Sequence, residues 1–144
     1  MEYDPYRMAR RLSSDQILDI AEELSELIST YERLVWKIAI ACFFSGIIGC
    51  LFFLVLTRRE PVLTPIGTAA SITGTWAIGF LLTRKTRVAI PQRISELKAQ
   101  NNERFWEALE FVQKNEGRSF MFVCFNRWWK NLEKEYKNRQ TISA

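Results

Sequence analysis

Two long apolar runs dominate the hydrophobic pattern of the chain, and a link of only four residues separates them. The first run covers residues 38–57 and the second covers residues 62–83, and neither contains a charged side chain. Each has about 20 residues, which is the length that an α-helix needs to cross ~30 Å of hydrocarbon. Because the link is so short, we predict that residues 38–83 form an antiparallel hairpin of two transmembrane helices.

An amphipathic pattern precedes the first span, in the N-terminal segment 1–37. Apolar residues alternate at spacings of three and four from residue 17 to residue 35, as in a coiled-coil seam. Ser13 is the expected N-cap, and no helix breaker stands between residues 14 and 57, so we predict one helix of about 43 residues. The acidic side chains assigned to its exposed face are Asp15, Asp19, Glu22, Glu23, Glu26 and Glu32.

The C-terminal segment 84–144 is basic and rich in aromatic residues, and its periodicity predicts two further helices. Pro91 is expected to begin the first of them, Asn101-Asn102 to interrupt its apolar face, and Gly117 to end it. The second helix is expected from Ser119 to about Asn138, followed by a frayed tail. The side chains expected to form its buried seam are Phe122, Phe125, Trp129, Leu132 and Tyr136. The predicted fold class is therefore all-α.

Small and hydroxyl-bearing residues gather on one side of each span, whereas bulky apolar ones occupy the lipid-facing side of the first. Small residues at every fourth position let helix backbones approach closely in lipid. The second span has such residues over more than half of its circumference, which favours a homo-oligomer in addition to the hairpin. The candidate packing positions are Ala41, Ser45, Gly49, Gly67 and Gly74, and the hydroxyl stripe consists of Thr64, Thr68, Ser71 and Thr75. The stripe could line a pore, or its hydroxyls could bond to their own helix and hold helices together.

Basic residues flank the predicted hairpin at its open end and outnumber those of the link. The positive-inside rule therefore predicts a multi-pass protein of the cell inner membrane with both termini in the cytoplasm. Acids dominate residues 14–33 and bases dominate residues 84–139, so the two arms are expected to pack on each other or on a neighbouring copy. The bases that decide the orientation are Arg7, Arg10, Arg11, Arg33, Lys37, Arg84, Lys85, Arg87 and Arg93, against Arg58 and Arg59 in the link.

The residue types that carry most enzyme chemistry are scarce in this chain. It has no histidine, and its three cysteines, Cys42, Cys50 and Cys124, do not form a disulfide framework. No phosphate-binding loop, nucleophile elbow or Cys/His cluster is present, so we expect no catalytic residue, cofactor or metal. The function classes that remain are non-enzymatic.

One C-terminal segment mixes aromatic and basic side chains, a combination that suits lipid headgroups or a small anionic ligand. Nucleic acid is the least favoured partner, because the net charge is only +4 and no nucleic-acid-binding motif is present. The candidate contacts are Arg118, Arg127, Trp128, Trp129 and Lys130.

The order of elements, an amphipathic helix, a two-span hairpin with a tight link, a basic stop and an amphipathic helix, resembles the SLATT group of small membrane effectors. The resemblance is one of architecture, covers residues 14 to about 115, and transfers no functional residue. It implies an oligomeric effector of bacterial nucleotide-signalled antiviral defence, whose cytoplasmic helices gate a pore or perturb the bilayer. The same order also looks like thylakoid curvature proteins, although the extension from Ser119 departs from that pattern. An accessory or scaffold subunit and a membrane-shaping protein are the alternative functions.

Overall fold

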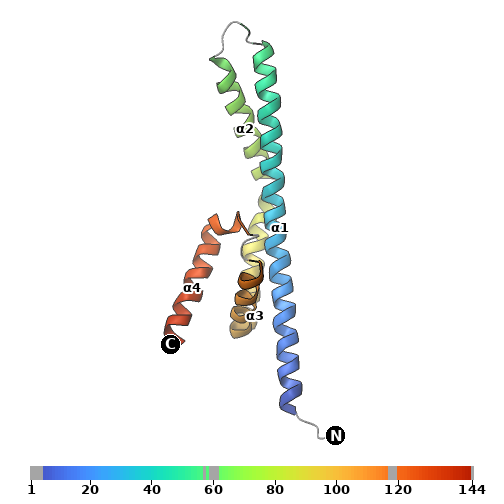
Figure 1. The fold of residues 1–144 in the computed structure, drawn as a ribbon, viewed down its shortest axis with the longest axis vertical. Coiled ribbons are helices and arrows are strands. Elements are labelled where there is room, and N and C mark those ends of the chain that lie inside the picture. Colours follow the sequence, from blue (N-terminus) through green and yellow to red (C-terminus); the bar gives the residue numbers. More distant parts are fainter. Residues whose placement is uncertain (1–4, 57, 59–61, 117–119, 144) are drawn as a thin grey trace. The chain divides into compact units, whose positions relative to one another are not determined.

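A computed structural model describes residues 5–56, 58, 62–116 and 120–143, with side chains from Ser14 onward except that of Glu116. All regular structure in these ranges is helical, which confirms the all-α class. The elements in chain order, shown in Figure 1, are α1 (Pro5–Leu56), α2 (Leu63–Leu82), α3 (Arg84–Glu116), the short 3-10 helix η1 (Val123–Phe125) and α4 (Arg127–Ser143).

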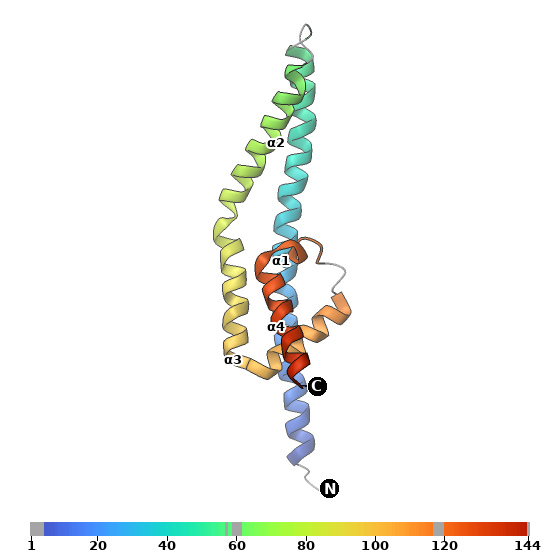
Figure 2. The ribbon, with the colours of Figure 1, turned by 90° about the vertical axis from the view of Figure 1, so that its left-hand side faces the viewer.

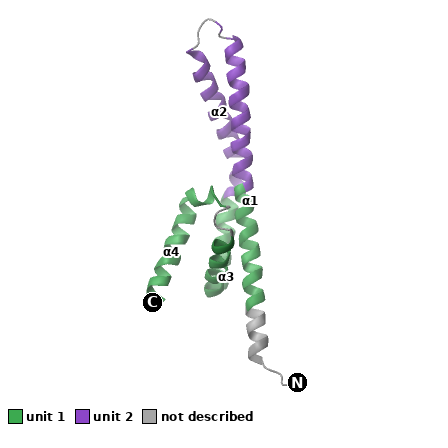
Figure 3. Cartoon of the chain, viewed as in Figure 1, with its two compact units in different colours: residues 1–32, 88–144 green, residues 33–87 purple. Residues whose placement is uncertain are grey.

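The helices form two compact units, coloured separately in Figure 3. Unit 1 comprises residues 1–32 and 88–144, and unit 2 comprises residues 33–87. Unit 1 therefore joins the acidic N-terminal arm to the basic C-terminal arm, as their opposite charges predict. Helix α1 contributes residues to both units, because it continues as one helix of 52 residues from Pro5 to Leu56.

The core of unit 1 is built from apolar faces of α1, α3, η1 and α4. The apolar face of α1 with heptad-like spacing is buried as predicted, and both halves of α3 contribute buried side chains to the same core. Burial of each large side chain contributes about 1.5–3 kcal/mol, which makes this core the main source of stability of the unit. The buried apolar residues are Ile20, Ala21, Leu24, Ile28, Tyr31, Ile90, Ile94, Leu97, Phe105, Trp106, Ala108, Leu109, Val112, Phe120, Val123, Trp129 and Leu132.

Helix α3 begins at Arg84, and the prediction that Pro91 begins it is wrong. The helical hydrogen bonds already run through Thr83, whose N–H donates to Gly79 O and whose carbonyl accepts from Arg87 N–H. Pro91 then sits inside the helix, where it removes one backbone donor without ending the element. The chain therefore passes from α2 into α3 with almost no connecting loop.

The predicted interruption at Asn101-Asn102 is a sharp kink inside α3, visible in Figure 2 as a change of helix direction. Asn102 has φ 33° and ψ −101°, a positive φ that residues with a side chain rarely adopt. The side-chain amide of Asn101 donates to Leu97 O at 3.1 Å, which satisfies a carbonyl at the end of the first half. The kink allows both halves of α3 to pack in the same unit.

Three other predicted helix boundaries differ from those observed. Helix α1 begins at Pro5 and not after a Ser13 cap, which agrees with the preference of proline for the first turn. Helix α2 begins at Leu63, one residue after the start of the predicted run 62–83, with Val62 at the cap. The last helix begins at Arg127, because Asn126 has extended backbone and its carbonyl accepts from Lys130 N–H.

The predicted frayed tail after Asn138 is helical up to Ser143. The hydroxyls of Thr141 and Ser143 donate to carbonyls four residues earlier, at 3.0 Å each. Gly117, expected to end α3, lies outside the described residues, although α3 does end immediately before it at Glu116.

Candidate functional site

Helices α1 and α2 pack antiparallel within unit 2, and hydroxyl groups bridge them near the middle of the pair. Ser45 Oγ donates to Ser71 O at 3.2 Å. Thr75 Oγ1 lies 2.7 Å from Ser45 Oγ and 2.9 Å from Ser71 O. Because an unsatisfied hydroxyl is costly in apolar surroundings, these bonds fix both the register and the facing sides of the two helices. We call this contact surface the seam.

Two glycines allow the backbones to approach at the seam. A Cβ at Gly49 would lie 2.8 Å from Ser71 Oγ and 3.0 Å from Ser71 Cβ. A Cβ at Gly67 would overlap the ring of Phe53. Both glycines are buried, so hydrogen is the only side chain that these two positions accommodate without a shift of the neighbours.

The hydroxyl stripe of the second span faces this seam. Thr68 Oγ1 donates back to Thr64 O at 2.8 Å, and Thr75 and Ser71 take part in the bridge to Ser45. These contacts are packing contacts within one chain, one of the two roles predicted for the stripe. A pore-lining role for the stripe stays a prediction.

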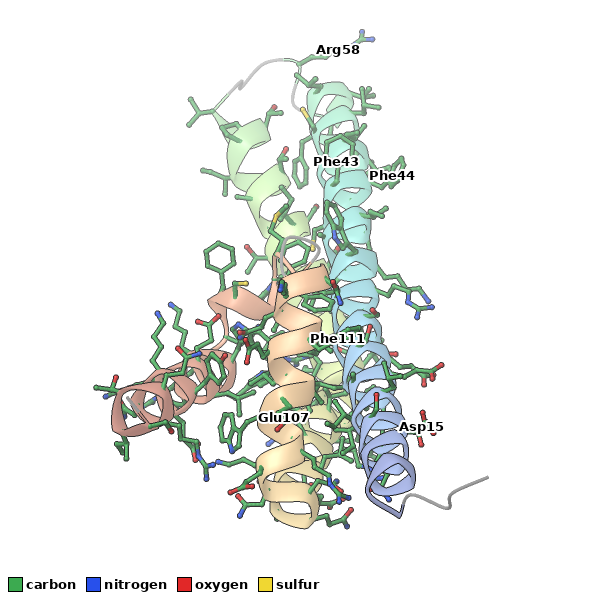
Figure 4. The ribbon with its side chains drawn as sticks, turned by 60° about the horizontal axis from the view of Figure 1, so that its bottom comes forward. Asp15, Phe43, Phe44, Arg58, Glu107 and Phe111 are labelled. Carbon is green, nitrogen blue, oxygen red and sulfur yellow. The ribbon has the colours of Figure 1, made fainter. Side chains whose placement is uncertain are left out.

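Two of the candidate packing residues lie outside the seam. Gly74 is exposed, and nothing lies within 4 Å of the position that its Cβ would take. Ala41 is exposed on α1 and lines a shallow groove of about 450 Å³, together with Ser45, Gly49 and Ser71. Bulky side chains such as Phe44 form the rest of the groove, and Figure 4 shows Phe44 projecting from the side of α1 away from α2.

We expect Gly49→Ile to open the seam and Gly74→Ile to leave it intact. Overpacking a close contact costs about 1–3 kcal/mol, whereas the same side chain at Gly74 meets open space. The measurement is intramolecular disulfide formation between Ser45→Cys and Thr75→Cys, in a background without the native cysteines. The yield should fall with Gly49→Ile alone, and equal yields in both glycine variants would contradict the observed packing.

In unit 1 a buried carboxylate joins α1 to the segment before α4. Glu32, predicted on the exposed acidic face, is only 6% exposed, so that prediction is wrong. Its Oε1 accepts from the backbone N–H of Val123 at 2.6 Å, and its Oε2 is buried with no hydrogen-bond partner among the described residues. Beside it, Tyr31 Oη donates to Asn126 Oδ1 at 2.9 Å. The spacing held a signal, because Glu32 follows the buried Ile28 by four residues and therefore shares its face.

The aromatic and basic candidates of the C-terminal segment divide between core and surface. Trp129 is 2% exposed and its indole N–H donates to Glu133 Oε1 at 2.9 Å, so it belongs to the core and is not available as a surface contact. Trp128 is half-buried, with its ring edge-on to Tyr31. Arg127 and Lys130 are exposed, and Arg118 lies outside the described residues.

The prediction that Phe125 belongs to a buried seam is wrong. Phe125 is 73% exposed, and Met121 beside η1 is 56% exposed. The reason is that residues 120–126 do not continue α4: they form a turn and η1, in which Phe120 and Val123 are the buried positions. The helical spacing of apolar residues therefore does not predict which side chains of residues 120–126 are buried.

Cys124 is exposed between these residues and is the one cysteine of unit 1. Partial desolvation raises the pKa of its thiol, and the negative charges of Glu133 and Glu32 raise it further. The thiol is therefore protonated at neutral pH, which disfavours a nucleophilic role. No group of three His, Cys, Asp or Glu that could hold a metal occurs among the described residues.

Ion pairs connect the helices of unit 1 at its surface. Arg93 on α3 bonds to Glu23 on α1 at 2.9 Å, and Glu23 is the first cause of the raised pKa of this arginine. Lys98 on α3 bonds to Glu135 on α4 at 2.5 Å. Water and salt screen exposed pairs of this kind, so they favour this pairing of the helices but add little to its stability.

The two units thus offer a hydroxyl-bridged seam with exposed apolar flanks and a buried carboxylate that anchors an apolar, basic turn. No family model matches this chain, and no curated protein or solved structure was found to match it.

Proposed function

We propose that this chain is an integral membrane protein whose residues 38–83 cross the bilayer as a two-helix hairpin. The described part of α1 from Ser14 to Leu56 and all of α2 are long and apolar enough to span, and only 17% and 6% of their most apolar windows are buried. A core helix of a soluble protein would be mostly buried, whereas these helices expose large apolar side chains along their length. The excess of basic residues at the open end of the hairpin supports cytoplasmic termini and an inner-membrane location.

Within the membrane the protein acts, in this proposal, as a non-enzymatic homo-oligomeric effector of the kind that the SLATT resemblance implies. Its cytoplasmic helices alter the packing of the spans and so open a pore or perturb the bilayer. The observation that carries the proposal is the continuity of α1. The same helix holds η1 through Glu32 and Tyr31, and holds α2 through Ser45 and Gly49. A ligand that binds one arrangement of unit 1 better than another can therefore bias α1, and with it the seam.

Assembly with further copies is supported by the small residues that the seam leaves uncovered. Gly74 and Ala70 are exposed on the same face of α2, and small residues on a spanning helix permit the close approach of a neighbouring backbone. The alternative function is an accessory or scaffold subunit of a larger membrane complex. The hydroxyl bridges between Ser45, Ser71 and Thr75 favour it, because these hydroxyls already have hydrogen-bond partners within the chain and do not require a water-filled pore.

The test compares the purified wild type with Gly74→Ile, by light scattering in detergent and by dye release from reconstituted vesicles. The wild type should be a defined homo-oligomer, and Gly74→Ile should weaken association by roughly tenfold or more, since about 1.4 kcal/mol corresponds to tenfold. Dye release should fall in parallel. The matched control is Ala69→Ile, which adds a similar side chain ~140° away around α2. A wild type that is monomeric and co-purifies with other chains would replace the effector function by the subunit function.

A further inference from the structure

The turn that contains η1 exposes the side chains of Met121 and Phe125, which we call the apolar tip, and its backbone is bonded to α1. The side chains of Met121 and Phe125 are 56% and 73% exposed, whereas Phe120 before them and Val123 between them are 2% and 0% exposed. The bond to α1 runs from Val123 N–H to Glu32. Exposure of two large apolar side chains to water is unfavourable, and their burial against a partner would stabilise the protein. The tip is therefore a candidate contact surface.

The residue of α1 that holds this turn is close in sequence to the first predicted span. Glu32 precedes Ile38, where the apolar run begins, by six positions in the same helix. At 1.5 Å per residue this is ~9 Å along α1. The polar interface on each side of the hydrocarbon core is about 5–8 Å thick, so Glu32 itself is expected at the outer edge of the headgroups when α1 spans the bilayer from Ile38.

The residues around the tip suit that location. Arg127 and Lys130 are exposed on the first turn of α4, directly after Phe125. The nearest acid on that helix, Glu133, accepts the indole N–H of the buried Trp129 and is half-buried. The surface therefore combines exposed apolar side chains with positive charge, the combination that binds anionic lipid at the membrane interface.

We propose that η1 and the first turn of α4 form a second membrane contact, on the headgroup surface of anionic phospholipid. Met121 and Phe125 enter the interface, and Arg127 and Lys130 bind lipid phosphates. This site rests on the proposed spanning of α1 and goes beyond it, because the contacts of unit 1 then depend on how much anionic lipid the membrane contains. Lipid binding at the tip acts on the segment that Glu32 holds, and so reaches α1 directly.

The experiment measures nitroxide depth in the full chain, reconstituted in phosphatidylcholine alone or mixed with phosphatidylglycerol. In a background with Cys42, Cys50 and Cys124 changed to serine, a spin label is placed at Phe125→Cys. Asn138→Cys, on the exposed C-terminal half of α4, gives the aqueous reference, and Ile48→Cys gives the hydrocarbon reference. Collision with oxygen reports lipid, and collision with a soluble nickel chelate reports water.

At position 125 we expect high oxygen contact and a several-fold lower collision rate with the nickel chelate than at position 138. Phosphatidylglycerol should strengthen this protection, and Arg127→Gln with Lys130→Gln should remove the strengthening. Equal nickel contact at 125 and 138, with position 48 in lipid, overturns the lipid contact and leaves the spanning proposal standing. Low contact with both probes at 125 means that protein covers the tip, which also overturns it. Nickel contact at 48 would refute both proposals.

Discussion

Trp129→Ala should destabilise unit 1 by about 3–5 kcal/mol, the range observed when a buried tryptophan or phenylalanine is truncated. Trp129 is 2% exposed, so its removal leaves a cavity that the surrounding helices fill only in part. The substitution also leaves Glu133 without the indole N–H that it accepts at 2.9 Å. Because a domain is stabilised by only about 5–15 kcal/mol in total, this single change removes a large fraction of the stability of unit 1.

Phe125→Ala is the matched control, an aromatic truncation four residues earlier in the chain. Phe125 is largely exposed, and its loss should change stability by no more than about 0.5 kcal/mol in detergent. The measurement is denaturant unfolding in detergent, followed by the near-ultraviolet signal of the buried tryptophans. Similar losses of stability in the two variants would show that Trp129 is not a core residue.

The sequence was sufficient to predict those features that depend on one helix alone. The apolar face of α1 from Ile20 to Tyr31 follows from the spacing of three and four between its apolar residues, and these side chains are buried. The two apolar runs are helical, with bulky and small residues on opposite sides of α1. The interruption at Asn102 was also visible, because two consecutive asparagines break the apolar face of α3.

Features that depend on distant segments could not be predicted in the same way. Glu32 was placed on the exposed face because acids surround it, and the partner of its carboxylate, the backbone N–H of Val123, lies 91 positions later in the chain. Phe125 and Trp129 both fit one helical period, and the turn that separates them is set by Asn126, which bonds to Tyr31 of α1. At the seam, the sequence indicated small residues on each helix but not which of them face the partner. Gly49 approaches Ser71, whereas Gly74 faces open space.

Glu32→Ala should loosen the segment that carries η1 and destabilise its docking on α1 by about 1–3 kcal/mol, the cost of leaving a buried donor unsatisfied. The carboxylate Oε1 is the acceptor for Val123 N–H at 2.6 Å, and the alanine variant offers that amide no replacement. Glu32→Gln retains an acceptor of similar reach and should lose less. The control is Glu26→Ala, since Glu26 is an exposed acid on the same helix.

Hydrogen exchange at the Val123 amide gives the direct readout of this contact. Since about 1.4 kcal/mol corresponds to a tenfold change in an equilibrium, exchange at Val123 should accelerate by roughly tenfold or more in Glu32→Ala. Exchange in the Glu26→Ala control should stay at the wild-type rate. An unchanged rate at Val123 in Glu32→Ala would mean that the buried carboxylate does not hold the turn. Faster exchange confined to residues 120–126 would show that Glu32 fixes the turn to α1 without supporting the rest of the core of unit 1.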